Sequence, residues 1–142
     1  MQLNVPILLI EDDYDDAVLI ADAVQELGVP HPVKHFATAV EAYEYLLVTT
    51  DKPLVILCDV KMPGLNGLSL LKNIIANEFL KKKAIPFVFL TALETKEVID
   101  EAYYLGVQGY FLKSRSYQGL KDQLLSVLVY WRASLHPNTP RL

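Results

Sequence analysis

The segment Leu54–Asp59 constrains the fold of this chain more than any other. Five apolar residues stand in an uninterrupted run and are followed directly by Asp59. A run that is short and apolar throughout is typical of a strand buried on both faces of a parallel sheet. The following segment Pro63–Gly67 is rich in proline, glycine and asparagine, which predicts a loop. We therefore expect Asp59 at the carboxyl end of a central strand, the edge at which open α/β sheets bind ligands.

Strand-like and helix-like segments alternate along the rest of the chain. Further strands are predicted at Pro6–Ile10, Val33–Phe36, Phe87–Leu90 and Gly109–Leu112. Predicted helices lie between Asp13 and Gly28, and at Ala39–Leu47, Leu68–Phe79, Thr95–Gly106 and Tyr117–Ala133. We expect Lys81–Pro86 to be an exposed connection. Five strand–helix units with short links predict an α/β fold, a doubly wound five-stranded parallel sheet of (βα)5, flavodoxin-like topology.

Length, charge and cysteine content exclude several classes of protein. The 142 residues fit one domain, which we place at residues 1–133, with a C-terminal tail at 134–142. A net charge of −4 and a single basic run, Lys81–Lys83, argue against nucleic-acid binding. The sequence has no recognisable signal peptide and no apolar run near the roughly 18 residues of a membrane helix. Its only cysteine, Cys58, fits a reducing compartment, so we expect a cytoplasmic protein with no membrane partner.

Polar residues follow four of the predicted strands at their carboxyl ends. They are Glu11 and Asp12, Asp59, Thr91, and Lys113. Right-handed crossovers bring these strand ends to one edge of the sheet. Asp13, Asp15 and Asp16 also follow the first strand, but they fit the start of a helix, where acidic residues cap free N–H groups. Any one polar residue at a strand end is explained by capping, whereas four such ends favour a common site.

The charges of this group predict its chemistry. Glu11, Asp12 and Asp59 are expected to gather within about 5 Å, where each pair repels by about 3 kcal/mol at an effective dielectric constant near 20. Lys113 alone does not neutralise them, and a hard cation with oxygen ligands, Mg²⁺, completes the balance. The site then suits a phosphoryl group, with Asp59 as the nucleophile and with Thr91 and Lys113 as donors to the phosphoryl oxygens.

The chain resembles the response-regulator receiver domain over about Ile7 to Trp131. The matching segments are Leu8–Asp13 (LLIEDD), Leu57–Gly67 (LCDVKMPGLNG), Phe89–Ala92 (FLTA) and Gly109–Lys113 (GYFLK). The resemblance implies a signalling protein that takes a phosphoryl group from a histidine kinase or a histidine phosphotransfer protein. It also implies that the protein is no turnover enzyme, because it only loses its own phosphoryl group slowly.

The same resemblance assigns roles to the site residues. It makes Asp59 the phosphoacceptor. It makes Asp12, Asp59 and the backbone carbonyl of Lys61 ligands of Mg²⁺, with Glu11 acting through water.

Further roles concern the phosphoryl group and the switch. Thr91 and Lys113 bind the phosphoryl group, and Thr91 and Tyr110 are the residues that switch on activation. The side chains of Lys61 and Leu93 control how water reaches the phosphorus.

Two features concern the C-terminal part of the chain. The ending Leu128–Trp131 is similar to stand-alone regulators found beside bacteriophytochromes. The receiver family usually has proline after the lysine, often with a cis bond, whereas this chain has Ser114. The sequence leaves open whether the Lys113–Ser114 bond is cis or trans.

Two other functions are compatible with parts of the pattern. A metal-dependent phosphohydrolase of the haloacid-dehalogenase type carries an Asp-x-Asp nucleophile on its first strand, whereas here that strand ends in Glu11–Asp13 and the isolated Asp59 follows the third. A receiver fold that binds a partner without phosphorylation is disfavoured by the complete acidic set and Thr91, but Ser114 leaves it open.

The last helix predicts a homodimer interface. One stripe of it is enough to cover the sheet, and this stripe is formed by Leu120, Leu124, Val127 and Trp131. Residues with no partner inside one chain remain on that helix and the one before it: Leu125, Leu128, Val129, Tyr130, Tyr103 and Tyr104. Exposed apolar and aromatic residues mark interfaces, and a two-fold pair is the commonest closed assembly. The alternative is that the tail folds back over this surface.

Overall fold

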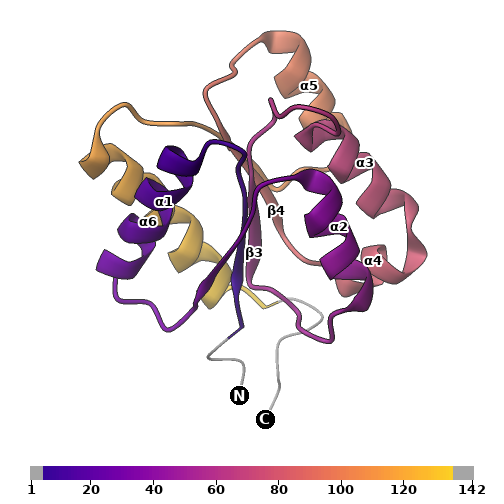
Figure 1. Ribbon diagram of the computed structural model, residues 1–142, viewed down its shortest axis with the longest axis horizontal. Coiled ribbons are helices and arrows are strands. Elements are labelled where there is room, and N and C mark those ends of the chain that lie inside the picture. Colours follow the sequence, from indigo (N-terminus) through magenta and orange to yellow (C-terminus); the bar gives the residue numbers. More distant parts are fainter. Residues whose placement is uncertain (1–4, 136–142) are drawn as a thin grey trace.

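The computed structural model describes residues 5–135 and contains one parallel sheet covered by helices on both faces (Figure 1). The strands are β1 (Ile7–Ile10), β2 (Val33–Phe36), β3 (Val55–Cys58), β4 (Phe87–Thr91) and β5 (Gly109–Leu112). The helices are α1 (Tyr14–Glu26), α2 (Ala39–Val48), α3 (Gly67–Ala76), α4 (Glu78–Lys83), α5 (Lys96–Tyr104) and α6 (Tyr117–Ala133). The strand order is β2-β1-β3-β4-β5 and all pairings are parallel, which confirms the predicted fold.

Successive residues of the central strands face opposite layers of the molecule. Ile7, Leu9, Val55 and Leu57 pack in one apolar cluster with α1 and α6, and the alternate residues pack in a second cluster with α2 and α3. Figure 1 shows α1 and α6 on one side of the sheet and α2, α3, α4 and α5 on the other. Because both faces are covered, β1, β3 and β4 are buried throughout, which explains their uninterrupted apolar sequence.

The loop after β3 depends on a glycine. A Cβ atom at Gly67 would lie 2.3 Å from the backbone oxygen of Asp59, so a larger residue does not fit. The amide of Gly67 donates to the backbone oxygen of Val60 at 2.9 Å, and the Asn66 side chain caps α3 by accepting from the amide of Ser69. The chain is thus folded back tightly against Asp59 before α3 begins.

Two expectations about the segment after β3 are wrong. The predicted helix Leu68–Phe79 is two helices, because Asn77 ends α3 and its side chain caps α4 by accepting from the amide of Leu80. Lys81–Pro86 is not wholly an exposed connection, since Lys83 is only 8% exposed. Its ammonium donates to the backbone oxygens of Leu46 and Thr49, which satisfies carbonyl groups at the end of α2.

One predicted interface residue is also placed wrongly. Leu128 is 0% exposed and packs with Leu124 and Val127 in the core. The buried stripe of α6 is wider than expected because α6 packs against α1 as well as the sheet. The other members of the predicted interface are exposed: Tyr103, Tyr104, Leu125, Val129 and Tyr130.

The last described helix ends at the residue where the sequence predicts the end of the domain. α6 ends at Ala133, and residues 136–142 of the expected C-terminal tail lie outside the described part of the chain. Within residues 5–135, no helix combines the length and apolar character needed to cross a membrane.

Candidate functional site

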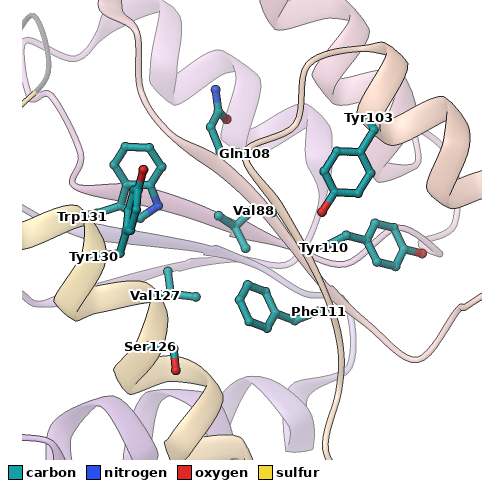
Figure 2. A pocket seen from close by; sticks show the side chains of 10 residues that line it. Val88, Tyr103, Gln108, Tyr110, Phe111, Ser126, Val127, Tyr130 and Trp131 are labelled. Carbon is teal, nitrogen blue, oxygen red and sulfur yellow. The ribbon is translucent and has the colours of Figure 1, made fainter. Parts of the chain in front are cut away.

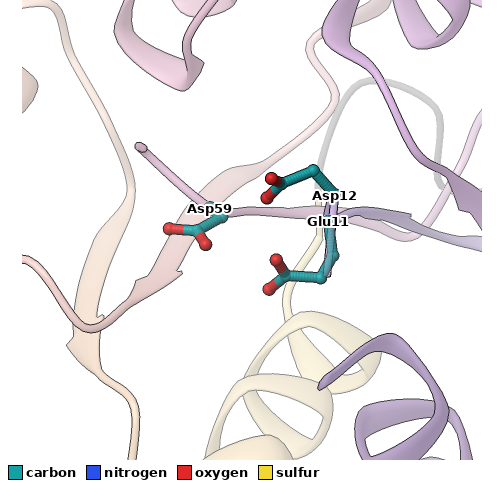
Figure 3. Close-up of side chains that lie close together, drawn as sticks. All are labelled: Glu11, Asp12 and Asp59. Atoms are coloured by element: carbon teal, nitrogen blue, oxygen red, sulfur yellow. The ribbon is translucent and has the colours of Figure 1, made fainter. Parts of the chain in front are cut away.

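Three carboxylates meet at the carboxyl edge of the sheet. Glu11 and Asp12 directly follow β1, Asp59 directly follows β3, and these two strands pair in register with Ile10 opposite Cys58. Each carboxylate places an oxygen within 4.8 Å of the others, and Figure 3 shows the three side chains converging from two strand ends. This confirms the clustering expected from the sequence.

Lys113 reaches this cluster from the end of β5. Its Nζ atom lies 2.6 Å from Glu11 Oε1, 2.9 Å from Asp16 Oδ2 and 3.6 Å from Asp59 Oδ2. The first two distances are hydrogen bonds, whereas the third is an ion pair without a hydrogen bond. One ammonium therefore joins carboxylates from β1, α1 and the β3 loop.

The titration of Glu11 and Lys113 reflects their burial and their pairing. Burial raises the pKa of Glu11 to about 7. The hydrogen bond and the charge of Lys113 lower this pKa, but by less than burial raises it. Burial lowers the pKa of Lys113, but hydrogen bonds to Glu11 and Asp16 outweigh burial and hold it above its ordinary value. We take Lys113 as charged and Glu11, only 2% exposed, as the group that titrates near neutral pH.

Asp16 is a site residue that the sequence analysis missed. Its position at the start of α1 fitted a helix-start role, and α1 indeed begins there, although the cap is the side chain of Asp13. The spacing of α1 could have indicated this role. Asp16 lies four residues before the buried Ile20, so both residues occupy the face of the helix that packs against the sheet.

Thr91 connects the acidic cluster to the far edge of the sheet. Its hydroxyl donates to Asp59 Oδ1 at 2.5 Å and accepts from the amide of Leu93 at 3.3 Å. The backbone oxygen of Leu93 in turn accepts a hydrogen bond from the hydroxyl of Tyr110. Tyr110 packs against Phe89, with ring centroids 5.8 Å apart. A continuous chain of contacts therefore joins Asp59, through Thr91 and Leu93, to Tyr110.

The loops around the site differ in how they are held. The amide of Lys61 lies 3.4 Å from Asp59 Oδ1, and its side chain is exposed.

No peptide bond within residues 5–135 is cis, so the Lys113–Ser114 bond is trans. The amide of Ser114 donates to the side chain of Gln123, which itself donates to the backbone oxygen of Leu112 at 2.5 Å. Gln123 of α6, which the sequence analysis did not single out, thus anchors the loop that carries Lys113.

A groove of about 320 Å³ lies between β5 and α6. Figure 2 shows that Tyr103 of α5, Tyr110 and Phe111 of β5, and Tyr130 and Trp131 of α6 line it. Two residues of the predicted dimer interface, Tyr103 and Tyr130, therefore border the same groove as Tyr110.

The donor set at the sheet edge fits a hard divalent cation. Its atoms are carboxylate oxygens, which Mg²⁺ and similar cations prefer, and their charge is only partly balanced by Lys113. The neighbouring Thr91 hydroxyl and Lys113 ammonium are donors suited to a group with several anionic oxygens.

Comparisons with known proteins agree with this arrangement. Residues 7–125 match the model of the response regulator receiver domain. The chain is 30% identical over 129 residues to the probable methanogenesis regulatory protein FilR2 of Methanothrix harundinacea, an alignment that covers 88% of this chain and 82% of that protein.

Two crystal structures share the whole fold. The phosphorylated cyanobacterial phytochrome response regulator RcpA superposes with a TM-score of 0.85 at 28% identity, covering 96% of this chain and 99% of that one. The Mn²⁺-bound form of the response regulator Rcp1, a protein of Synechocystis, superposes with a TM-score of 0.80 at 26% identity, covering 93% and 97%. The likeness to RcpA, a phytochrome response regulator, agrees with the resemblance to phytochrome-associated regulators noted from Leu128–Trp131. This chain belongs to the response regulator receiver domain family.

Proposed function

We propose that this protein is a single-domain response regulator that accepts a phosphoryl group on Asp59 in a Mg²⁺-dependent reaction. The observation that carries the proposal is the placement of Asp59, whose carboxylate faces the carboxylates of Glu11 and Asp12 and lies close to the Thr91 hydroxyl and the Lys113 ammonium. The donor is a phosphohistidine on a histidine kinase or a histidine phosphotransfer protein. The proposed setting is the cytoplasm, in keeping with a single, buried free thiol at Cys58.

The metal site of this proposal combines the carboxylate oxygens gathered at the sheet edge with one backbone oxygen of the loop after β3. Asp12, Asp59 and the carbonyl of Lys61 would hold the cation, with Glu11 acting through water. The bound cation would neutralise charge on the carboxylates and the incoming phosphoryl group. The Mn²⁺-bound structure of Rcp1 supports a divalent cation in a protein of this fold, and the oxygen donor set favours Mg²⁺.

The chemistry proposed for the chain's own residues is a displacement at phosphorus. An oxygen of Asp59 forms a bond to phosphorus as the bond to the histidine nitrogen breaks, which yields an acyl phosphate. Lys113 and Thr91 donate hydrogen bonds to the phosphoryl oxygens. Hydrolysis of the acyl phosphate later restores Asp59, and the exposed side chains near the mouth of the site, above all Lys61, govern the access of water.

Activation in this proposal starts with Thr91. Its hydroxyl leaves Asp59 Oδ1 to reach a phosphoryl oxygen, and the contact with Leu93 and Tyr110 changes with it. Tyr110 lines the groove between β5 and α6, so this movement alters the surface offered to a partner.

We further propose that the protein forms a homodimer through α5 and α6. Five aromatic or aliphatic residues of the interface expected from the sequence are exposed on these helices, and Tyr104 is 89% exposed. The adjacent groove adds Trp131 and Phe111 to the same side of the molecule. An exposed apolar patch of this kind is typical of an interface.

Labelling with a small phosphodonor tests the proposed function. Acetyl phosphate with Mg²⁺ is expected to add one phosphoryl group to the wild-type protein, as measured by intact mass, and chelation of the metal is expected to prevent it. Asp59→Ala should not be labelled, whereas Asp100→Ala, which removes an exposed carboxylate on α5, should be labelled normally. Undiminished labelling of Asp59→Ala would refute the assignment.

The two other functions make different predictions in the same experiment. A phosphohydrolase of the haloacid-dehalogenase type would release phosphate from small phosphate esters with many turnovers. A receiver fold that works without phosphorylation would not be labelled even at saturating acetyl phosphate.

A further inference from the structure

Asp16 and Asp59 both lie close to the same ammonium group. Lys113 Nζ is 2.9 Å from Asp16 Oδ2 and 3.6 Å from Asp59 Oδ2. We infer that Asp16 is a positioning residue that holds Lys113 on the α1 side of the site and competes with a phosphoryl group on Asp59 for its ammonium. This inference rests on the proposed function of Asp59.

The local structure of α1 fixes the carboxylate of Asp16 in this position. The side chain of Asp13 accepts a hydrogen bond from the amide of Asp16 at 3.0 Å, which sets the start of the helix. Asp16 then lies on the face of α1 that carries the buried Ala17 and Ile20 toward the sheet. Its carboxylate is placed by the helix itself rather than by a mobile loop.

The two carboxylates bonded to Lys113 differ in how readily they release it. Glu11 is buried, and loss of its hydrogen bond to Lys113 would leave its carboxyl group in the interior with only the bond from the amide of Asp13 among its described hydrogen bonds. The Asp16 side chain is 42% exposed, and water can replace Lys113 there at little cost. When Lys113 turns toward Asp59, the bond to Asp16 is therefore the one that breaks.

The competition has a definite direction. The hydrogen bond to Asp16 stabilises the unphosphorylated state, in which Lys113 does not hydrogen bond to Asp59. A phosphoryl group on Asp59 adds negative charge near Asp16, and like charges at this range repel. Asp16 should therefore weaken the phosphorylated state and its analogues, and its neutralisation should strengthen them.

Asp15 provides a matched control for this inference. It is the neighbouring acidic residue in the first turn of α1, and it is exposed. It makes no ion pair with any residue of the described range 5–135. Asp15→Asn removes the same charge from the same helix end, so a general effect on the helix dipole or on the field of the site would appear in both variants.

The experiment measures the affinity of beryllofluoride, a phosphoryl analogue, at saturating Mg²⁺ for each variant. Asp16→Asn is expected to bind about tenfold more tightly than wild type, which corresponds to about 1.4 kcal/mol. Asp15→Asn and Asp16→Glu, which keeps the carboxylate, are expected to stay within about twofold of wild type. A separate readout uses the side-chain ¹⁵N resonance of Lys113 in the protein without beryllofluoride, which should shift in Asp16→Asn but not in Asp15→Asn.

The outcomes separate this inference from the proposed function. Equal affinities for Asp16→Asn and Asp15→Asn, or weaker binding by Asp16→Asn, would overturn the role of Asp16. Failure of the wild-type protein to bind beryllofluoride or to be labelled at Asp59 would instead overturn the proposed function. The Lys113 resonance reports the Asp16 contact in either case, and a resonance unchanged in Asp16→Asn would show that the contact is not held in solution.

Discussion

The hydroxyl of Thr91 donates to Asp59 Oδ1 at 2.5 Å, so the ends of β4 and β3 are joined through the proposed phosphoacceptor itself. Thr91 also accepts from the amide of Leu93, whose backbone oxygen is bonded by Tyr110. A change at Asp59 therefore has a direct route to the β5–α6 groove. The side-chain donors and acceptors of this route are the hydroxyl groups of Thr91 and Tyr110, so a substitution that removes one of them interrupts the route.

The first prediction concerns this route. A fluorotyrosine label at Tyr110 should change its ¹⁹F resonance when beryllofluoride binds to the wild-type protein, because Thr91 then leaves Asp59 and disturbs Leu93. Thr91→Ser, which keeps the hydroxyl, should preserve the change, and Thr91→Ala should lose it while still binding beryllofluoride. A full response of Tyr110 in Thr91→Ala would mean that the coupling runs through other residues.

The second prediction concerns the repulsion among Glu11, Asp12 and Asp59. Without divalent cations, Asp59→Asn should raise the free energy of unfolding by about 1–2 kcal/mol. Relief of roughly 3 kcal/mol of repulsion with each of Glu11 and Asp12 exceeds the combined loss of the 3.6 Å ion pair with Lys113 and weakening of the hydrogen bond from Thr91. Thermal unfolding in chelator measures this difference, which corresponds to several degrees in Tm. Mg²⁺ should stabilise the wild-type protein more than Asp59→Asn. A variant less stable than wild type in chelator would show that the carboxylates are not in conflict.

The third prediction follows from the raised pKa of Glu11. Between its ordinary value of 4.5 and about 7, the folded protein holds a proton on Glu11 that the unfolded chain has released. The metal-free protein should therefore lose stability as pH rises through this window, by at most about 1.4 kcal/mol per pH unit from this group. Denaturant unfolding of wild type and Glu11→Gln across this range isolates the contribution, because only the wild type carries it. Parallel stability curves for the two proteins would exclude the shift.

The fourth prediction concerns Lys61. Its side chain is exposed two residues after Asp59, and the described contacts of Lys61 involve only its backbone amide. Lys61→Ala should change the rate at which the acyl phosphate is hydrolysed while leaving the free energy of unfolding within about 0.5 kcal/mol of wild type. Phosphoryl loss followed by intact mass provides the rate, with Lys52→Ala on a distant exposed loop as the control. An unchanged lifetime would remove Lys61 from the mechanism.

The sequence was sufficient to predict most of the sheet and the residues Asp12, Asp59 and Thr91 of the site, because the strands are apolar runs and these residues stand at their carboxyl ends. A strand buried on both faces must be apolar, so a carboxylate directly after it, such as Asp59, is conspicuous. Parallel pairing then places Asp12, Asp59 and Thr91 at one edge without knowledge of any side-chain packing. The position of such residues can be predicted from the local sequence pattern and the order of the strands alone.

Contacts between elements distant in sequence were not predictable in this way. Asp16 reaches Lys113 and Gln123 anchors Ser114 only once α1 and α6 are packed against the sheet. Lys83 was expected to be solvated because its neighbours are lysines. It is instead buried, and two backbone oxygens at the end of α2 accept hydrogen bonds from its ammonium. Leu128 was predicted to be exposed because one apolar stripe of α6 is enough to cover the sheet. In the structure α1 also packs against α6, and Leu128 is buried.

The final prediction tests the homodimer with variants chosen from the observed exposure. Tyr130→Glu and Val129→Glu place a charge on the exposed face of α6, so they should weaken self-association while leaving the fold intact. Leu128→Glu should behave differently, because a charge in the core without a partner destabilises the monomer itself. Val48→Glu is the matched control, since Val48 is an exposed apolar residue at the end of α2, which contacts β2 at the edge of the sheet opposite β5.

Sedimentation velocity at micromolar concentration, with and without beryllofluoride and Mg²⁺, measures the association. We expect a dimer for wild type and Val48→Glu, and predominantly monomer for Tyr130→Glu and Val129→Glu. Circular dichroism distinguishes these folded monomers from the unfolding expected of Leu128→Glu. Monomeric wild-type protein under both conditions would refute the dimer. Dissociation caused only by Val48→Glu would place the interface at α2 instead of at α5 and α6.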